Sequence, residues 1–136
     1  MSETERIARA LIDRSLPKAD WTHHAHLRAG LWHVLEHGPF EAMERLRARI
    51  CAYNESVGTA NTDTSGYHET ITRFYVVIID RFLSTVDRTA DPDVLAEPWT
   101  SYTYVRRLNP NPARQDEATE CSERDLDLLA DPYLRG

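Results

Sequence analysis

The chain lacks the features that mark several common protein classes. It has only two cysteines, Cys51 and Cys121, without the spacing of a metal-binding motif, so we expect both to be reduced thiols. No apolar run approaches the roughly 18 residues that a membrane span needs. No glycine-rich phosphate loop is present, so no nucleotide cofactor is expected. The 16 basic residues are outnumbered by 22 acidic ones, and the net charge of -6 argues against non-specific binding to nucleic acid.

The remaining composition is typical of one soluble globular domain. The 136 residues are 41% hydrophobic and 28% charged. A chain of this length buries roughly two-thirds of the surface that it exposes when unfolded. The first five residues, Met1 to Glu5, are acidic and polar, which is the reverse of a secretory signal. We therefore expect a cytoplasmic protein that binds neither nucleic acid nor a membrane.

The spacing of apolar residues predicts an all-α fold. Four helices are expected, each with an apolar stripe that faces a shared core: residues 3–14, 22–37 (capped by Asp20 or Thr22), 40–56 and 67–86. His37-Gly38-Pro39 would stop the second helix, and a short helical turn after Asp91 would end before Pro98. Residues 1–108 should thus form a compact single-domain bundle of four to five helices, followed by an irregular acidic tail over 109–136.

One segment is open to another interpretation. The β-branched run Val76-Val77-Ile78-Ile79 could belong to a strand. However, apolar residues recur there at helical spacing, and no turn residue interrupts them: Ile71, Tyr75, Ile78, Phe82 and Val86. A helix is therefore the prediction for this segment.

His68 is the most informative residue of the chain. Helical spacing places it on the core-facing side of its helix, in line with Tyr75 and Ile79. Burying an imidazole there without a polar partner would cost roughly 2 kcal/mol or more, so another polar group should face it. Its neighbours Glu69 and Thr72 would line the same cavity, one at the rim and one a helical turn below.

The best partners for His68 lie in the segment Thr22-His23-His24-Ala25-His26, at the start of an earlier helix. His23 and His26 are three residues apart and hence neighbours on the helix surface, whereas His24 is expected to point elsewhere. The amides at a helix N-terminus carry partial positive charge, which disfavours a charged imidazole. We therefore expect His23 and His68 to be neutral near pH 7 and able to accept a proton or bind a metal.

Three interpretations of this constellation compete. His23, His26 and His68 could bind a divalent metal such as zinc, iron or manganese, with Glu69 as a further ligand or as a base. Without a metal, an imidazole could act as a general acid or base, with Glu69 and Thr72 completing the catalytic set. Alternatively, the imidazoles have only local roles, such as capping a helix or bonding a backbone carbonyl.

Arginines beside the motifs could bind an anionic substrate. Arg28 and Arg73 each follow a motif histidine closely, and a guanidinium can hold an anion by two hydrogen bonds. A surface salt bridge is the alternative for both. Tyr67 is the third expected substrate-binding residue. By contrast, His33 and His37 are expected on a solvated face.

The two motifs together resemble those of a family of small bacterial all-α proteins of uncharacterised activity. Members of that family pair an aromatic-x-His-x-x-His-hydrophobic motif with a Tyr-His-Glu-Thr-x-Thr motif. The resemblance covers residues 18–85, and the C-terminal third departs from the family pattern. The matching positions of this chain are His23, His26, Tyr67, His68, Glu69 and Thr72.

The resemblance implies a function in natural-product biosynthesis, including pathways that build an aziridine ring by expelling sulfate. A neutral histidine would deprotonate an amine, and Arg73 and the helix N-termini would receive the leaving anion. The expected enzyme is a lyase or cyclase acting on a small molecule, with a metal-dependent hydrolase as the alternative.

A non-catalytic function is the second hypothesis. The chain could be an accessory subunit that docks on a partner enzyme, or on a second copy of itself, through aromatic residues of an irregular segment. The aromatic residues expected there are Trp99, Tyr102 and Tyr104.

Overall fold

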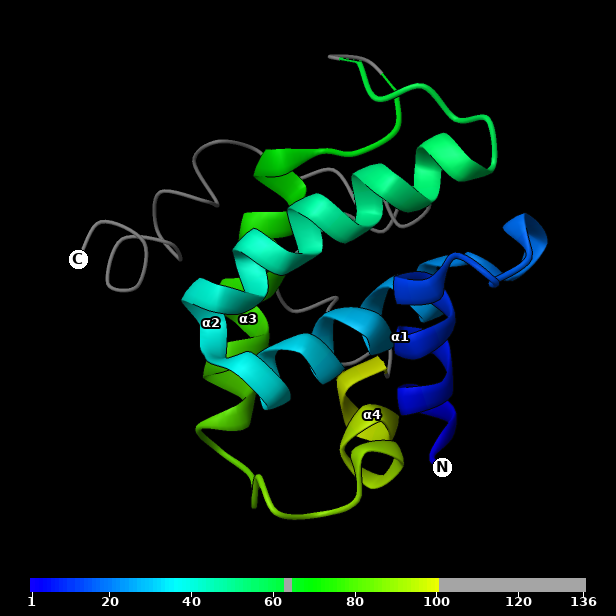
Figure 1. Cartoon of the computed structure of the whole chain (residues 1–136). Helices are drawn as coiled ribbons and strands as arrows, with labels where there is room; N and C mark the ends of the chain where they lie inside the picture. Colours follow the sequence, from blue (N-terminus) through cyan, green and yellow to red (C-terminus); the bar gives the residue numbers. More distant parts are fainter. Residues whose placement is uncertain (63–64, 101–136) are drawn as a thin grey trace, which may run out of the picture.

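Four α-helices make up the described part of the chain, which is residues 1–62 and 65–100 of the computed structural model. They are α1 (Glu3–Asp13), α2 (His23–Ser56), α3 (Glu69–Leu83) and α4 (Pro92–Thr100), with a 3-10 turn at Lys18–Asp20 (Figure 1). Within these ranges the only β pairing is an isolated bridge between Thr62 and Ser65, and no helix is both long and apolar enough to cross a bilayer. The predicted all-α bundle is confirmed, while the expected acidic tail lies outside the described residues, as do Tyr102 and Tyr104.

Local hydrogen bonds set both ends of α1. The Ser2 hydroxyl accepts the N–H of Glu5 at 3.0 Å and so caps the first turn. Arg14 ends the helix in the left-handed conformation, with φ 64°. Between these ends the helix buries an apolar stripe: Ile7, Ala8 and Leu11. The predicted helix over residues 3–14 is therefore confirmed to within one residue.

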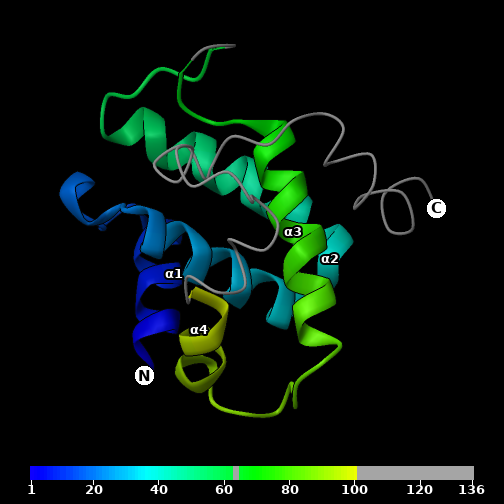
Figure 2. The same cartoon turned by 180° about the vertical axis from the view of Figure 1, so that it is seen from behind.

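α2 bends sharply at Gly38, whose φ of 76° and ψ of 168° are not helical. A left-handed φ is open to glycine, and the following Pro39 has no N–H with which to continue the hydrogen-bond ladder. The stop expected at His37-Gly38-Pro39 is therefore confirmed as a break between two helical halves, 23–37 and 39–56. Figures 1 and 2 show the first and second halves leaving the bend in different directions, like the arms of a V.

The main core lies where α3 packs against both halves of α2. Gly30 allows a close approach of the two helices, because a Cβ there would lie 3.0 Å from Cδ1 of Ile79. The segment with the β-branched run is thus helical, as predicted. The buried cluster draws on α2, α3 and α4: Leu27, Leu31, Val34, Met43, Leu46, Ile78, Ile79, Phe82, Leu95 and Trp99.

α4 runs past the proline at which we expected it to end. It continues through Pro98 to Thr100, although a proline inside a helix removes a hydrogen bond and costs roughly 3 kcal/mol. Trp99 offsets this cost, because it is fully buried and its Nε1 donates to the backbone oxygen of Leu27 at 3.0 Å. Trp99 is therefore a core residue and not an exposed docking residue.

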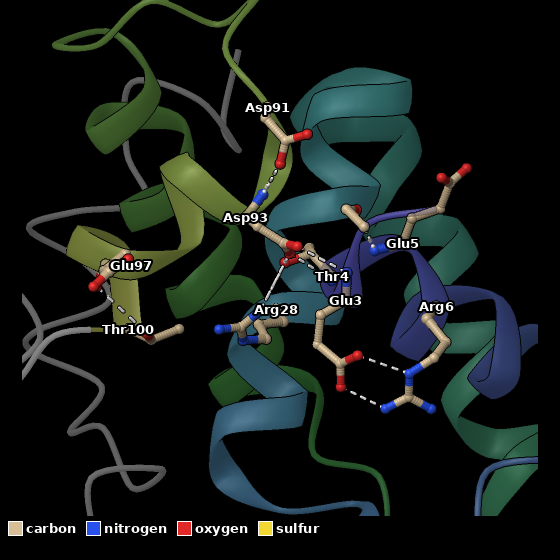
Figure 3. Close-up of polar contacts among 10 residues, drawn as sticks. Glu3, Thr4, Glu5, Arg6, Arg28, Asp91, Asp93, Glu97 and Thr100 are labelled. Carbon is tan, nitrogen blue, oxygen red and sulfur yellow. Dashed lines mark hydrogen bonds and ion pairs between the residues drawn. The ribbon is translucent and has the colours of Figure 1, made fainter.

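The carboxylate of Asp93 joins the beginnings of α1 and α4 (Figure 3). It accepts the backbone N–H of Glu3 at 2.9 Å, and the N–H and the hydroxyl of Thr4, each at 2.8 Å. From α2, Nη1 of Arg28 lies 3.3 Å from the carboxylate and donates to the Thr4 hydroxyl at 3.1 Å. Burial raises the pKa of Asp93, but the hydrogen bonds from Thr4 and Glu3 and the charge of Arg28 outweigh it and hold that pKa below its ordinary value.

Asp93→Ala should lower the free energy of unfolding by about 2 kcal/mol, because the N–H groups of Glu3 and Thr4 lose their acceptor and Arg28 loses its counter-ion. Urea denaturation monitored by circular dichroism measures the change. Glu97→Ala is the matched control, since this acidic residue is exposed on the same helix, and it should change stability by less than about 0.5 kcal/mol. Equal effects of the two substitutions would contradict the role given to Asp93.

Candidate functional site

The first motif begins α2. Thr22 is the N-cap residue, and its hydroxyl accepts the N–H of Ala25 at 3.2 Å. Nδ1 of His26 lies 2.6 Å from the backbone oxygen of Thr22. Because a carbonyl only accepts, Nδ1 carries the hydrogen and Nε2 keeps its lone pair. The ring stacks on Trp21, with centroids 3.7 Å apart, and burial lowers the pKa of His26 to about 4 even though the residue keeps an exposed edge.

His23 is the residue of the first motif that reaches α3. Its ring meets the ring of Tyr75 edge-on, with centroids 6.1 Å apart and planes at 65°. The residue is exposed, and within the described part of the chain neither ring nitrogen makes a hydrogen bond. Partial burial, and then the neighbouring His24, lower the pKa of His23. The ring is therefore neutral at pH 7, accessible, and equipped with an unused lone pair.

His68 does not lie on the buried face of α3, contrary to our prediction. It is the N-cap residue, exposed and extended (φ -126°, ψ 106°), and the helix begins at Glu69. The prediction is wrong because it assumed a helical conformation at His68 itself. Nδ1 accepts the N–H of Ile71 at 3.4 Å, so in the neutral ring Nε2 carries the hydrogen. Thr72 donates its hydroxyl to the backbone oxygen of His68 at 2.8 Å.

Glu69 is held by Arg47 of α2 and by Tyr67. Nε and Nη2 of Arg47 lie 2.8 and 2.6 Å from the two carboxylate oxygens, and the Tyr67 hydroxyl donates to one of them at 2.7 Å. The Arg47 hydrogen bonds are the main reason why the pKa of Glu69 lies below its ordinary value; burial opposes them and Tyr67 adds to them. Burial, and then Glu69, raise the pKa of Tyr67. Glu69 is thus a fixed anion whose oxygens are already engaged.

The structure brings the two motifs together only in part. The ring of His23 meets that of Tyr75, one helical turn beyond Thr72, but within the described residues no hydrogen bond or ring contact joins His23 or His26 to His68. No three His, Cys, Asp or Glu side chains in that part of the chain are grouped as metal ligands would be. The trio expected to bind a metal, His23, His26 and His68, is therefore not assembled there.

The two arginines expected to bind an anion lie in different places. Arg28 belongs to the junction of α1 and α4 in Figure 3, where its Nη1 contacts Asp93 and Thr4. Arg73 is exposed on α3, and its positive charge contributes to the low pKa of Glu69. Of the two, only Arg73 lies at the second motif.

The expectation that His33 is solvated is wrong, because this residue is fully buried. Its Nδ1 lies 2.7 Å from the backbone oxygen of Ala29, and Nη1 of Arg49 lies 3.0 Å from its Nε2. Since arginine can only donate, Nε2 accepts and Nδ1 carries the hydrogen. Burial is the main reason why the pKa of His33 is lowered to about 4. The bend of α2 at Gly38 explains the error. It brings Arg49, on the second half of α2, against the face of the first half that carries His33, which an isolated helix would expose. His37 on the same face is half-buried.

Two residues that hold the second motif carry no recognisable signal in the sequence. Arg47 resembles Arg45, which pairs with Glu41 on the surface of the same helix. Asn61 stands in the polar loop before α3, where its side-chain oxygen accepts the N–H of Tyr67 at 3.0 Å. Only the spatial arrangement distinguishes these residues from ordinary surface groups.

Comparison of the chain with models of protein families, with curated proteins and with solved structures finds no match. The resemblance described above therefore rests on the residues of the two motifs alone.

The buried His33 should make the fold labile to acid. Its pKa is about 4 in the folded chain and about 6.5 when unfolded, so the folded chain binds fewer protons between these values. The stability that the neutral, buried His33 gives the fold is therefore complete above pH 6.5. It is lost as the pH falls toward 4, by roughly 1 kcal/mol per pH unit. Urea denaturation between pH 7 and pH 5 should show the fall. The His33→Gln variant should be less stable at pH 7, but its free energy of unfolding should fall less steeply between pH 7 and pH 5. A fall as steep as that of the wild type would contradict the assignment of acid lability to His33.

Proposed function

We propose that the chain is a small-molecule enzyme that uses the imidazoles at the beginnings of α2 and α3 for acid–base chemistry. The observation that carries this proposal is the state of His23, which is accessible, free of hydrogen bonds within the described residues, and in contact with Tyr75 of α3. Its lowered pKa keeps the ring neutral at pH 7, and a neutral imidazole with a free lone pair can accept a proton. His23 is therefore the proposed base.

His68 is the proposed hydrogen-bond donor to the substrate. Its Nδ1 is occupied by the N–H of Ile71, so Nε2 carries a hydrogen that can be offered to solvent or to a substrate. His26 presents the opposite tautomer, with a lone pair at Nε2, but a pKa of about 4 makes it a weak base at neutral pH. The proton acceptor His23 and the hydrogen-bond donor His68 thus come from different motifs.

Glu69 has a supporting role in this proposal. Its carboxylate is ionised and already bonded to Arg47 and Tyr67, so it has little capacity to accept a further proton. Its fixed charge instead holds the Tyr67 hydroxyl and ties the start of α3 to the second half of α2. A network of this kind keeps the neighbouring His68 in one place during a reaction cycle.

A metal-assisted version of the site differs in one respect. His26 donates Nδ1–H to a carbonyl and leaves Nε2 available, as metal-binding histidines usually do. Together with His23 it could supply two ligands, whereas His68 is not grouped with them. Acid–base chemistry does not require that grouping, and so the geometry supports it better.

The proposed reaction is an elimination or cyclisation, of which aziridine formation in natural-product biosynthesis is the case that the motif resemblance suggests. His23 would take a proton from a substrate amine, whose lone pair forms the new N–C bond while the C–O bond to sulfate breaks. Sulfate leaves with the electron pair of that bond, and the exposed Arg73 beside the second motif could receive it. No electrons are gained or lost overall, so this reaction needs no redox cofactor.

His23→Ala and His68→Ala should each lower the amount of pathway product in the producing organism by about 100-fold, the lower end of what a general base or a hydrogen-bond donor to developing negative charge contributes. Mass spectrometry of the product, with immunoblotting of the variant protein, measures the effect. His24→Ala is the matched control, because His24 is the exposed neighbour of His23 and affects it only through a smaller contribution to its pKa, so it should change the amount of product far less.

Wild-type product levels in both variants, at normal protein levels, would refute the catalytic proposal. Gel filtration with candidate pathway enzymes would then test the accessory-subunit hypothesis directly.

A further inference from the structure

The side-chain amide of Asn61 ties the loop before α3 to α2. Its Nδ2 donates to the backbone oxygen of Cys51 at 3.1 Å, and its Oδ1 accepts from Nδ2 of Asn54 at 2.9 Å. Oδ1 also accepts the backbone N–H of Tyr67 at 3.0 Å. The carbonyl of Cys51 requires a donor and the N–H of Tyr67 requires an acceptor, so two backbone groups fix the orientation of this amide. An aspartate would supply only the acceptor.

Gly66 allows the chain to come this close to Asn61. Its φ is +81°, and a Cβ at this position would lie 2.4 Å from the backbone oxygen of Ala60 and 2.7 Å from Oδ1 of Asn61. The first group is backbone and the second belongs to an amide held by three hydrogen bonds, so neither can move aside cheaply. Glycine is therefore required here for its conformation and for the space it leaves.

Holding Tyr67 determines the conformation of the residue that follows. Tyr67 is bound at both ends, by Asn61 at its N–H and by Glu69 at its hydroxyl. His68 lies between this anchored residue and the first turn of α3, in the extended conformation that directs Nδ1 to the N–H of Ile71. A different path of the chain into α3 would remove this cap.

We infer that Asn61 is a positioning residue of the site, which holds His68 as the N-cap of α3 through the N–H of Tyr67. No hydrogen bond joins Asn61 to the His68 ring among the described residues, so Asn61 acts through the backbone. The catalytic consequence of this inference rests on the proposed function, whereas the cap can be measured on the protein alone.

Amide hydrogen exchange of the full chain, followed by NMR, tests the inference without a substrate. Asn61→Ala removes the acceptor of Tyr67 and should make the Ile71 amide exchange roughly 5- to 10-fold faster, because the His68 cap is released. Asn61→Asp keeps an oxygen acceptor for Tyr67, and its Ile71 rate should stay within about twofold of wild type. Ser65→Ala, an exposed residue of the same loop, is the matched control.

Amides in the middle of α3, such as those of Ile78 and Ile79, show whether each variant is folded. An unchanged Ile71 rate in Asn61→Ala would overturn the inference, and so would equal acceleration in Asn61→Ala and Asn61→Asp. If Asn61→Ala does not fold, Asn61→Asp decides, since rapid exchange at Ile71 in a folded Asn61→Asp would refute the role of the acceptor. Failure of the proposed function looks different: Ile71 would respond as described, while His23→Ala and His68→Ala would leave the pathway product unchanged.

Discussion

The bend of α2 at Gly38 is the constraint on which the rest of the structure depends. A straight helix of 34 residues would be about 50 Å long and could present only one stripe to a neighbour. The bend lets the two halves pack on α3 from different directions, and the hydrogen bond between His33 and Arg49 joins them. Trp21, which precedes α2, consequently meets Tyr53 near the end of α2, with ring centroids 5.6 Å apart.

The candidate site uses both arms of the bent helix. Arg47, on the second half, binds Glu69 and thereby anchors the start of α3, while His23, at the start of the first half, contacts Tyr75 further along α3. The protonation states follow from these surroundings. A carboxylate that faces a guanidinium stays ionised, and a partly desolvated imidazole without a counter-ion stays neutral. The site therefore combines a rigid anionic support with a neutral group that can take up a proton.

Local patterns in the sequence predict most of the fold, whereas the site depends on contacts that those patterns do not contain. Caps, turn glycines and apolar spacing act within a few residues of one another, so the helices and the break at Gly38 are predictable. His68 is predicted one position too far inside its helix, because the choice between cap and first turn depends on how the preceding loop is held by Asn61. The burial of His33 and the pairing of Arg47 with Glu69 require knowledge of where the second half of α2 lies, which no short-range pattern provides.

The central claim is that His23 is a neutral and accessible proton acceptor. The most direct measurement is an NMR titration of its ring, assigned by comparison with a His23→Gln variant. The account predicts a midpoint below 6.5, the ordinary value for histidine. A midpoint at or above about 7 would contradict it, because much of the ring would then be protonated at neutral pH and unable to accept a proton.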